Sequence, residues 1–309
     1  MSSRPTFIVI GAQKAATTSV FQWLREHPDV YLPAQKELEF FSNDRLYERG
    51  FGFYCDRWFR ETGAAKAIGE VSPQYMMSGA TPARIAENLP DVQLIAVLRN
   101  PIDRAYSHYV MSLRRGLEKK SFEEAIDTLV MKPHSVPMQL DELSYLEAGL
   151  YGRILGEFRK FFSEHSLRVV FYETLIQDPE GCLENLCRFI GVDAAFIPQN
   201  IGTVFNRGSS LKRFPRFESW MMKQKNLKRL VKAIVPHEHL SKFLFWFDTE
   251  MNVFRTKSTH ASGPTPVARE RLRHYYREDV RKLETLLGCE VPWTELRSSN
   301  VDRKRPLHA

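Results

Sequence analysis

The chain has 309 residues, of which 43% are hydrophobic and 26% are charged, and its formal net charge at pH 7 is +7. These proportions are ordinary for a soluble globular chain with a large core. No apolar run approaches the roughly 20 residues of a transmembrane helix, which excludes a membrane-spanning protein from the predicted classes.

The first predicted element is a buried β-strand over residues 6–10, which ends abruptly at Gly11. A short loop with one lysine, Lys14, follows, and Thr17 begins an amphipathic helix. The N-terminus of a helix presents unpaired N–H groups and the positive end of the helix dipole, so this corner attracts an anion. Lys14 adds a cation and residues 17–19 add hydroxyl donors. The stretch therefore predicts a phosphate-binding loop, with a strand–helix turn and a solvated lysine as the alternative.

This loop differs from the loop of ATP-binding proteins. The ATP-type pattern places a lysine directly after its second glycine. Here Lys14 lies three residues after Gly11, and Ala16 stands where a second glycine would be expected. The ligand therefore has to be inferred from the rest of the chain.

The following elements alternate between strand and helix. Strands are predicted at residues 30–32, 67–71, 92–98 and 167–172, and helices at residues 44–61, 82–89, 101–115, 142–165, 179–190 and 269–287. This alternation predicts an α/β fold with a P-loop-like parallel β-sheet flanked by helices on both faces. We expect a single domain over residues 1–309, with a nucleotide-binding core of about residues 5–192 and a basic, mostly helical C-terminal part of about residues 206–290, where strand signals stop.

The strand over residues 92–98 delivers Arg99 to the edge at which open α/β sheets bind ligands. An ATP hydrolase would hold an aspartate there for magnesium, whereas a guanidinium suits bidentate contact with a phosphate. Asn100 and Pro101 begin the next helix, and Ser107 lies two turns along it on the same face. A salt bridge at a strand end is the alternative for Arg99 alone. Arg99 and Lys14 together predict a ligand with two separated anionic groups.

Residues 11–18 and 98–107 resemble the two nucleotide motifs of the sulfotransferases, most closely those of the bacterial and Golgi-type carbohydrate branch. The resemblance spans residues 6–192 and weakly includes the last helix. In that family the first motif holds the 5′-phosphosulfate of 3′-phosphoadenosine-5′-phosphosulfate (PAPS), and the second holds its 3′-phosphate. The resemblance thus implies PAPS-binding roles for Gln13, Lys14, Ala15, Ala16, Thr17, Thr18, Arg99 and Ser107, and through a late glycine-rich loop for Arg207 and Gly208.

The same resemblance implies the catalytic residues. Residues 36–41 match the segment that carries the family's catalytic glutamate, so Glu37 would take the proton of an acceptor hydroxyl. Lys14 would stabilise the departing phosphate oxygen during a direct in-line transfer that needs no metal. Glu39 is the rival base, with a solvated loop carboxylate as its alternative.

Three positions on the acceptor side depart from heparan-type relatives. Val71, Glu39 and Ser42 stand where those relatives have a lysine, a histidine and an aspartate. The expected acceptor is therefore a hydroxyl of a carbohydrate or glycolipid whose identity the sequence leaves open. Two other functions stay open: a P-loop nucleotide kinase, and a non-catalytic module that binds anions or nucleic acid.

The whole net charge lies in one segment, because residues 212–232 contain eight basic residues and a single glutamate. Such a segment is typical of a solvated helix face, and the alternative is contact with an anionic glycan or with lipid headgroups. Nucleic acid is not the expected partner. Four cysteines without metal-ligand spacing, and a start that leaves no room for a signal peptide, predict a cytoplasmic protein, located peripherally at the inner membrane surface if the segment binds lipid.

Overall fold

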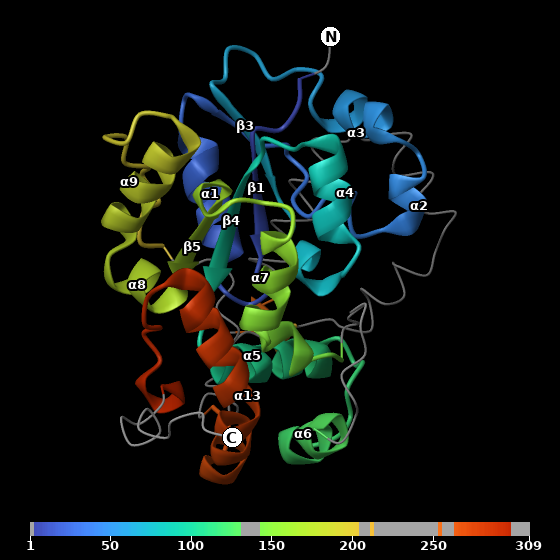
Figure 1. Ribbon diagram of the computed structural model, residues 1–309, viewed down its shortest axis with the longest axis vertical. Helices are drawn as coiled ribbons and strands as arrows, with labels where there is room; N and C mark the ends of the chain where they lie inside the picture. Colours follow the sequence, from blue (N-terminus) through green and yellow to red (C-terminus); the bar gives the residue numbers. More distant parts are fainter. Residues whose placement is uncertain (1–2, 131–142, 204–210, 213–252, 255–262, 298–309) are drawn as a thin grey trace, which may run out of the picture.

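The computed structural model describes residues 3–130, 143–203, 211–212, 253–254 and 263–297. Its centre is a five-stranded sheet in the order β2-β3-β1-β4-β5, in which every neighbouring pair is parallel (Figure 1). The strands are β1 (Phe7–Gly11), β2 (Val30–Tyr31), β3 (Ala67–Val71), β4 (Gln93–Leu98) and β5 (Leu167–Phe171). The predicted α/β fold with a parallel sheet is confirmed.

The middle of the sheet is buried because its strands are apolar on both faces. Every residue of β1 and β3 is buried, as is every residue of β4 after its first. Parallel strands covered on both sides form such continuous apolar runs. Gly69 of β3 lets the Phe7 ring of β1 pack closely, since a Cβ at that glycine would lie 2.4 Å from the ring.

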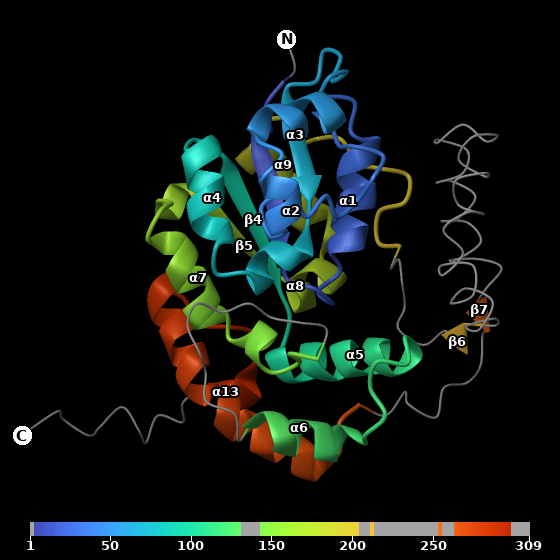
Figure 2. The same cartoon turned by 90° about the vertical axis from the view of Figure 1, so that its right-hand side faces the viewer.

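Helices cover both faces of this sheet. The α-helices are α1 (Thr17–Glu26), α2 (Asp44–Tyr47), α3 (Phe51–Trp58), α4 (Thr81–Asn88), α5 (Pro101–Arg114), α6 (Phe122–Val130), α7 (Tyr151–Arg159), α8 (Tyr172–Gln177), α9 (Pro179–Ile190) and α13 (Pro266–Leu287). The 3₁₀ helices are η1 (Pro73–Met77), η2 (Glu147–Gly149), η3 (Glu164–Ser166) and η5 (Thr294–Leu296). Helices α4 and α7 lie on one face of the sheet and α1 on the other (Figure 2).

Helix α5 crosses below the carboxyl ends of the strands, and α6 and α13 lie beyond it (Figure 2). The side chain of Asn100 caps α5 as predicted, accepting the Ile102 N–H at 3.0 Å. Helix α13 is joined to α7 by the buried carboxylate of Asp279, which accepts the N–H groups of Gly152 and Arg153, both at 2.8 Å. The C-terminal helix is therefore part of the same core as the parallel sheet.

Two predicted helices are wrong in extent. In place of one helix over residues 142–165, the described residues form η2, α7 and η3. Leu150, with ψ of 69°, interrupts the helix, and Gly149 packs so tightly that a Cβ would lie 2.9 Å from the Tyr276 hydroxyl. Packing against α13 thus prevails over the local periodicity. The prediction over residues 44–61 divides into α2 and α3, since Gly50 adopts φ of 83° between them.

A short antiparallel pair, β6 (Leu211–Lys212) with β7 (Val253–Phe254), lies in the C-terminal part where no strand was predicted. Strands of two residues are too short to show a period in the sequence. The helix over residues 269–287 is confirmed as α13, and the thiols of Cys182 and Cys187 are buried in α9.

Candidate active site

The loops that follow β1, β2 and β4 meet at the carboxyl edge of the sheet, where β3 also ends. Arg99 Nη1, from the end of β4, donates to the carbonyl of Lys14 at 3.3 Å. The N–H of Glu37 donates to the carbonyl of Val71, at the end of β3, at 3.0 Å. The fold therefore brings together the phosphate loop, the predicted base and the predicted second anion site.

The backbone is strained at this edge. Among the described residues, four that are not glycine have a left-handed φ: Lys14 at 73°, Ala16 at 63°, Glu37 at 65° and Glu39 at 57°. Such a conformation costs of order 1–3 kcal/mol and persists where the surroundings enforce it, typically at functional sites. Ala16 thus adopts the conformation that the missing second glycine would favour.

The start of α1 forms an anion-binding corner. Its N-cap is Ala16, which has no side-chain acceptor for the first N–H groups, and its first turn contains no acidic residue. Thr17 and Ala15 are buried, whereas Thr18 is partly exposed. The N–H of Ala12 donates to the carbonyl of Val97 at 2.7 Å and ties the loop to β4. This hydrogen bond holds the loop in place beside the start of α1.

Two glutamines leave polar atoms available beside the loop. The Oε1 atoms of Gln13 and Gln74 are buried and have no hydrogen-bond partner among the described residues. Buried polar atoms in proteins are nearly always paired. These two oxygens therefore fit a site that is completed by a polar ligand.

Cations outnumber carboxylates around Lys14. Burial, followed by the charges of three arginines, lowers the pKa of the Lys14 ammonium to about 8, while Glu37 acts in the opposite direction. The arginines are Arg114, Arg115 and Arg99. An anionic ligand would relieve this repulsion, so the electrostatics fit a molecule that carries several phosphate groups.

One face of α5 lines the loop. Met111 Sδ lies 3.9 Å from Lys14 Nζ, and Ser107 precedes Met111 by one helical turn on the same face. Arg114 and Arg115 follow at the next turn. Neither arginine was predicted from the sequence, although their spacing from Ser107 carried the signal.

The carboxylate of Glu37 is held from two sides. Lys36 Nζ contacts Oε1 and Gln74 Nε2 donates to Oε2, both at 2.7 Å. Burial acts to raise the pKa of Glu37, but the charge and hydrogen bond of Lys36 and the hydrogen bond of Gln74 outweigh it, so this pKa lies below its usual value. Glu37 is therefore ionised at neutral pH, and with 38% of its side chain exposed it can accept a proton from an incoming hydroxyl. Gln74 was not predicted, and its place just after β3 was the available signal.

Arg99 is supported through its own backbone and ring contacts. Its guanidinium carbon lies 4.7 Å from the centre of the Tyr172 ring. Its carbonyl accepts the Tyr151 hydroxyl at 3.0 Å. These contacts fix the direction in which Arg99 leaves β4.

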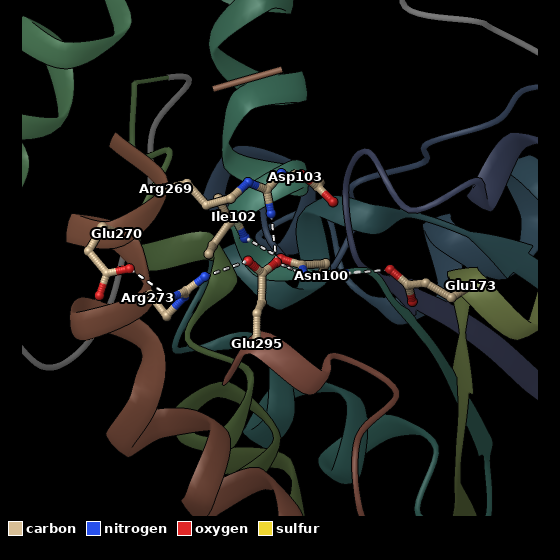
Figure 3. Close-up of polar contacts among 8 residues, drawn as sticks. All are labelled: Asn100, Ile102, Asp103, Glu173, Arg269, Glu270, Arg273 and Glu295. Carbon is tan, nitrogen blue, oxygen red and sulfur yellow. Dashed lines mark hydrogen bonds and ion pairs between the residues drawn. The ribbon is translucent and has the colours of Figure 1, made fainter. Parts of the chain in front are cut away.

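The residue after Arg99 is held by the C-terminal part of the chain (Figure 3). Glu173 accepts the N–H of Asn100 at 2.8 Å, and Glu295 accepts the side-chain amide of Asn100 at 2.8 Å. Arg269 of α13 contacts Glu295 at 2.6 Å and also pairs with Asp103. Residues far apart in sequence therefore position the start of α5 and, with it, Arg99.

Some of the predicted residues lie outside the described part of the chain. They are Arg207, Gly208 and the basic positions from Arg213 to Lys232. Within the described residues, no helix is both long and apolar enough for a bilayer crossing. The same residues contain no group of three or more histidine, cysteine, aspartate or glutamate side chains arranged to hold a metal ion.

Comparison with known proteins identifies similar sequences over most of the chain. The family model described as "Sulfotransferase domain" matches residues 4–250. Human heparan sulfate glucosamine 3-O-sulfotransferase 3B1 is 32% identical over 290 residues, which cover 94% of this chain and 65% of that protein. The mouse protein of the same name is 32% identical over 188 residues, or 61% of this chain and 46% of that protein. The chain thus spans between about half and two thirds of these curated relatives.

The fold has a counterpart among solved structures. A sulfotransferase from Alicyclobacillus acidocaldarius superposes with a TM-score of 0.65 at 23% identity, covering 94% of this chain and 98% of that one. At this identity the likeness establishes the shared fold.

Proposed function

Since this chain belongs to the sulfotransferase domain family, we propose that it transfers the sulfuryl group of PAPS to a hydroxyl of a carbohydrate or glycolipid. The observation that carries the proposal is the meeting of an ionised Glu37 with the cations Lys14 and Arg99 at one sheet edge. The names of the heparan sulfate relatives support a carbohydrate acceptor.

The residues at this edge fit PAPS. We propose that residues 13–18 hold the 5′-phosphosulfate, with the N–H groups of α1 and the Lys14 ammonium as donors. Arg99 and Ser107 would hold the 3′-phosphate, because both lie at or beyond the end of β4 and α5 presents Ser107 toward the loop. The unpaired Gln13 Oε1 is available to a donor on the nucleotide.

The proposed reaction is a direct transfer. PAPS supplies the sulfuryl group: the bond from sulfur to the phosphate oxygen breaks as the bond to the acceptor oxygen forms. Glu37 takes the hydroxyl proton, and Lys14 stabilises the negative charge that develops on the departing phosphate. Lys36 and Gln74 keep the Glu37 carboxylate ionised and oriented, so no movement of this group is needed during the step.

Nucleotide selectivity tests this function directly. We expect adenosine 3′,5′-bisphosphate, at a hundred times its dissociation constant, to stabilise the protein by about 2.7 kcal/mol and to raise its melting temperature by roughly 5 °C without magnesium. AMP should give a much smaller shift because it lacks the 3′-phosphate. Thermal melting with each nucleotide measures the difference. An equal shift with ATP and magnesium would favour the kinase alternative, and equal shifts with all polyanions would favour the non-catalytic module.

For the basic segment we propose contact with an anionic glycan or lipid headgroups. We also propose a cytoplasmic location, which is peripheral at the inner membrane surface if the segment binds lipid. Changing Lys225, Lys228, Arg229 and Lys232 to glutamate should weaken binding to anionic vesicles or acceptor turnover at low salt, while nucleotide affinity stays unchanged. Screening over about 10 Å at 0.1 M salt should reduce the difference.

The matched control reverses four exposed lysines elsewhere: Lys66, Lys119, Lys160 and Lys282. Binding to anionic vesicles is followed by sedimentation, and turnover by transfer of labelled sulfate. If both four-residue variants behave alike, the segment is a solvated surface and this proposal is wrong.

A further inference from the structure

We propose that Glu70 is a positioning residue that fixes the loop carrying Glu37, acting through the hydroxyls of Ser72 and Tyr75. The inference rests on the proposed function, because it assigns the buried network to the orientation of the proposed base. Glu70 itself has 1% exposed surface, and its carboxylate accepts from Tyr54, Ser72 and Tyr75 rather than contacting Glu37 directly.

Three hydroxyl groups converge on the Glu70 carboxylate. Tyr54 and Tyr75 donate to Oε1 at 2.5 and 2.9 Å, and Ser72 donates to Oε2 at 2.7 Å. Burial raises the pKa of Glu70 to about 7, and the three hydrogen bonds act in the opposite direction. Burying a carboxylate without a cationic partner among these contacts destabilises the folded state, and an apolar residue at this position would pack with a lower free energy.

Ser72 connects Glu70 to the loop that carries Glu37. Its Oγ accepts the N–H of Leu38 at 3.0 Å and that of Glu39 at 3.4 Å. The Ser72 hydroxyl donates its one hydrogen to Glu70 Oε2. Its lone pairs are therefore left for the two amides that follow Glu37.

Tyr75 makes a second connection of the same kind. Its hydroxyl donates to Glu70 and accepts the N–H of Phe41 at 3.4 Å. The two connections hold a stretch in which Glu37 and Glu39 both have left-handed backbones. Such strain persists only when neighbouring structure fixes it, and the Glu70 network supplies that restraint.

Tyr54 provides a matched control for Tyr75. Both tyrosines are fully buried and both donate to the same carboxylate oxygen, but in the contacts above only the Tyr75 hydroxyl accepts an amide of the loop. Replacement by phenylalanine removes one hydroxyl in either case and keeps the ring. A merely structural role for the network predicts equal effects of the two changes.

The experiment measures turnover, nucleotide affinity and amide exchange in Ser72→Ala, Tyr75→Phe and Tyr54→Phe. With a carbohydrate acceptor that the parent protein sulfates, the first two variants should lose roughly 10- to 100-fold in kcat, the effect of a misplacement of about 1 Å. Their Kd for adenosine 3′,5′-bisphosphate should stay unchanged, and Tyr54→Phe should keep the kcat of the parent. Hydrogen exchange should accelerate at the Leu38 and Glu39 amides in Ser72→Ala and at the Phe41 amide in Tyr75→Phe.

The outcomes separate this inference from the proposed function. Parent-like kcat in Ser72→Ala and Tyr75→Phe, or an equal loss in Tyr54→Phe, would overturn the positioning role while sulfotransfer stands. Unchanged amide exchange in both would overturn it as well. If the parent protein transfers no sulfate to any acceptor, the proposed function fails, and faster exchange at the same amides would still show that the network holds the loop.

Discussion

Replacing Glu37 with glutamine is expected to lower the turnover of sulfuryl transfer roughly 10²–10⁴-fold, the usual contribution of a general base. Glutamine keeps the shape of the side chain and can still contact Lys36 and Gln74, but it cannot take a proton. Affinity for adenosine 3′,5′-bisphosphate should change little, because Lys14 and Arg99 stay in place. Turnover with labelled PAPS and a thermal shift with the bisphosphate measure the two effects separately.

Two further variants identify the role of Glu37. Glu39→Gln changes a residue of the same loop that shares the left-handed backbone, and it should leave turnover near that of the parent. Arg99→Ala should instead weaken the bisphosphate by removing a charge-assisted contact. Near-normal turnover in Glu37→Gln, combined with loss in Glu39→Gln, would reassign the base to Glu39.

The pH dependence of stability gives an independent check on the Glu37 environment. Because its folded pKa lies below the ordinary value, ionised Glu37 contributes stability that is present above that value and is lost as the pH falls through the folded pKa. Glu70 acts in the opposite sense, because its folded pKa of about 7 favours the protonated form. The stability that protonated Glu70 contributes is present below its ordinary pKa and is lost as the pH rises through about 7. The two carboxylates are thus held in opposite electrostatic environments by one loop and the strand beside it.

The parts of the site that the sequence predicted are those encoded locally. The strand before Gly11, the helix from Thr17 and the capped start of α5 at Asn100 depend on neighbouring residues, and all three are confirmed. Parallel strands then bring their carboxyl ends to one edge, so Lys14 and Arg99 could be placed together before any contact was known.

Long-range contacts explain what could not be predicted. The amide of Asn100 meets Glu295 across 195 positions in sequence, and no local pattern marks that pairing. The break at Leu150 depends on α13, which packs on α7 from the far end of the chain. The Glu70 network joins residues 34 positions apart through side-chain hydroxyls, and hydroxyl geometry leaves no periodic trace in a sequence.

Replacing Lys14 with methionine is expected to lower turnover roughly 10²–10³-fold, the loss seen when one preorganised donor is removed from a developing negative charge. Methionine retains an unbranched apolar stem beside Met111, so the loop should keep its packing. The loss should also appear in binding, since the ammonium is one of the donors proposed for the 5′-phosphate. Single-turnover rates at saturating PAPS separate the catalytic loss from weaker binding.

The pKa of Lys14 gives this prediction a pH signature. With its pKa lowered to about 8, the ammonium of the free protein loses its proton as the pH rises through that value. An anionic ligand restores the charge, so binding should take up a proton, and affinity for adenosine 3′,5′-bisphosphate should fall by up to about tenfold per pH unit above 8. Lys14→Arg keeps its charge at these pH values and should show no such fall, and Lys14→Met should bind weakly at every pH. A parent protein whose affinity is constant from pH 7 to 9 would contradict the role of Lys14, because a phosphate held by this ammonium must lose affinity as the ammonium is neutralised.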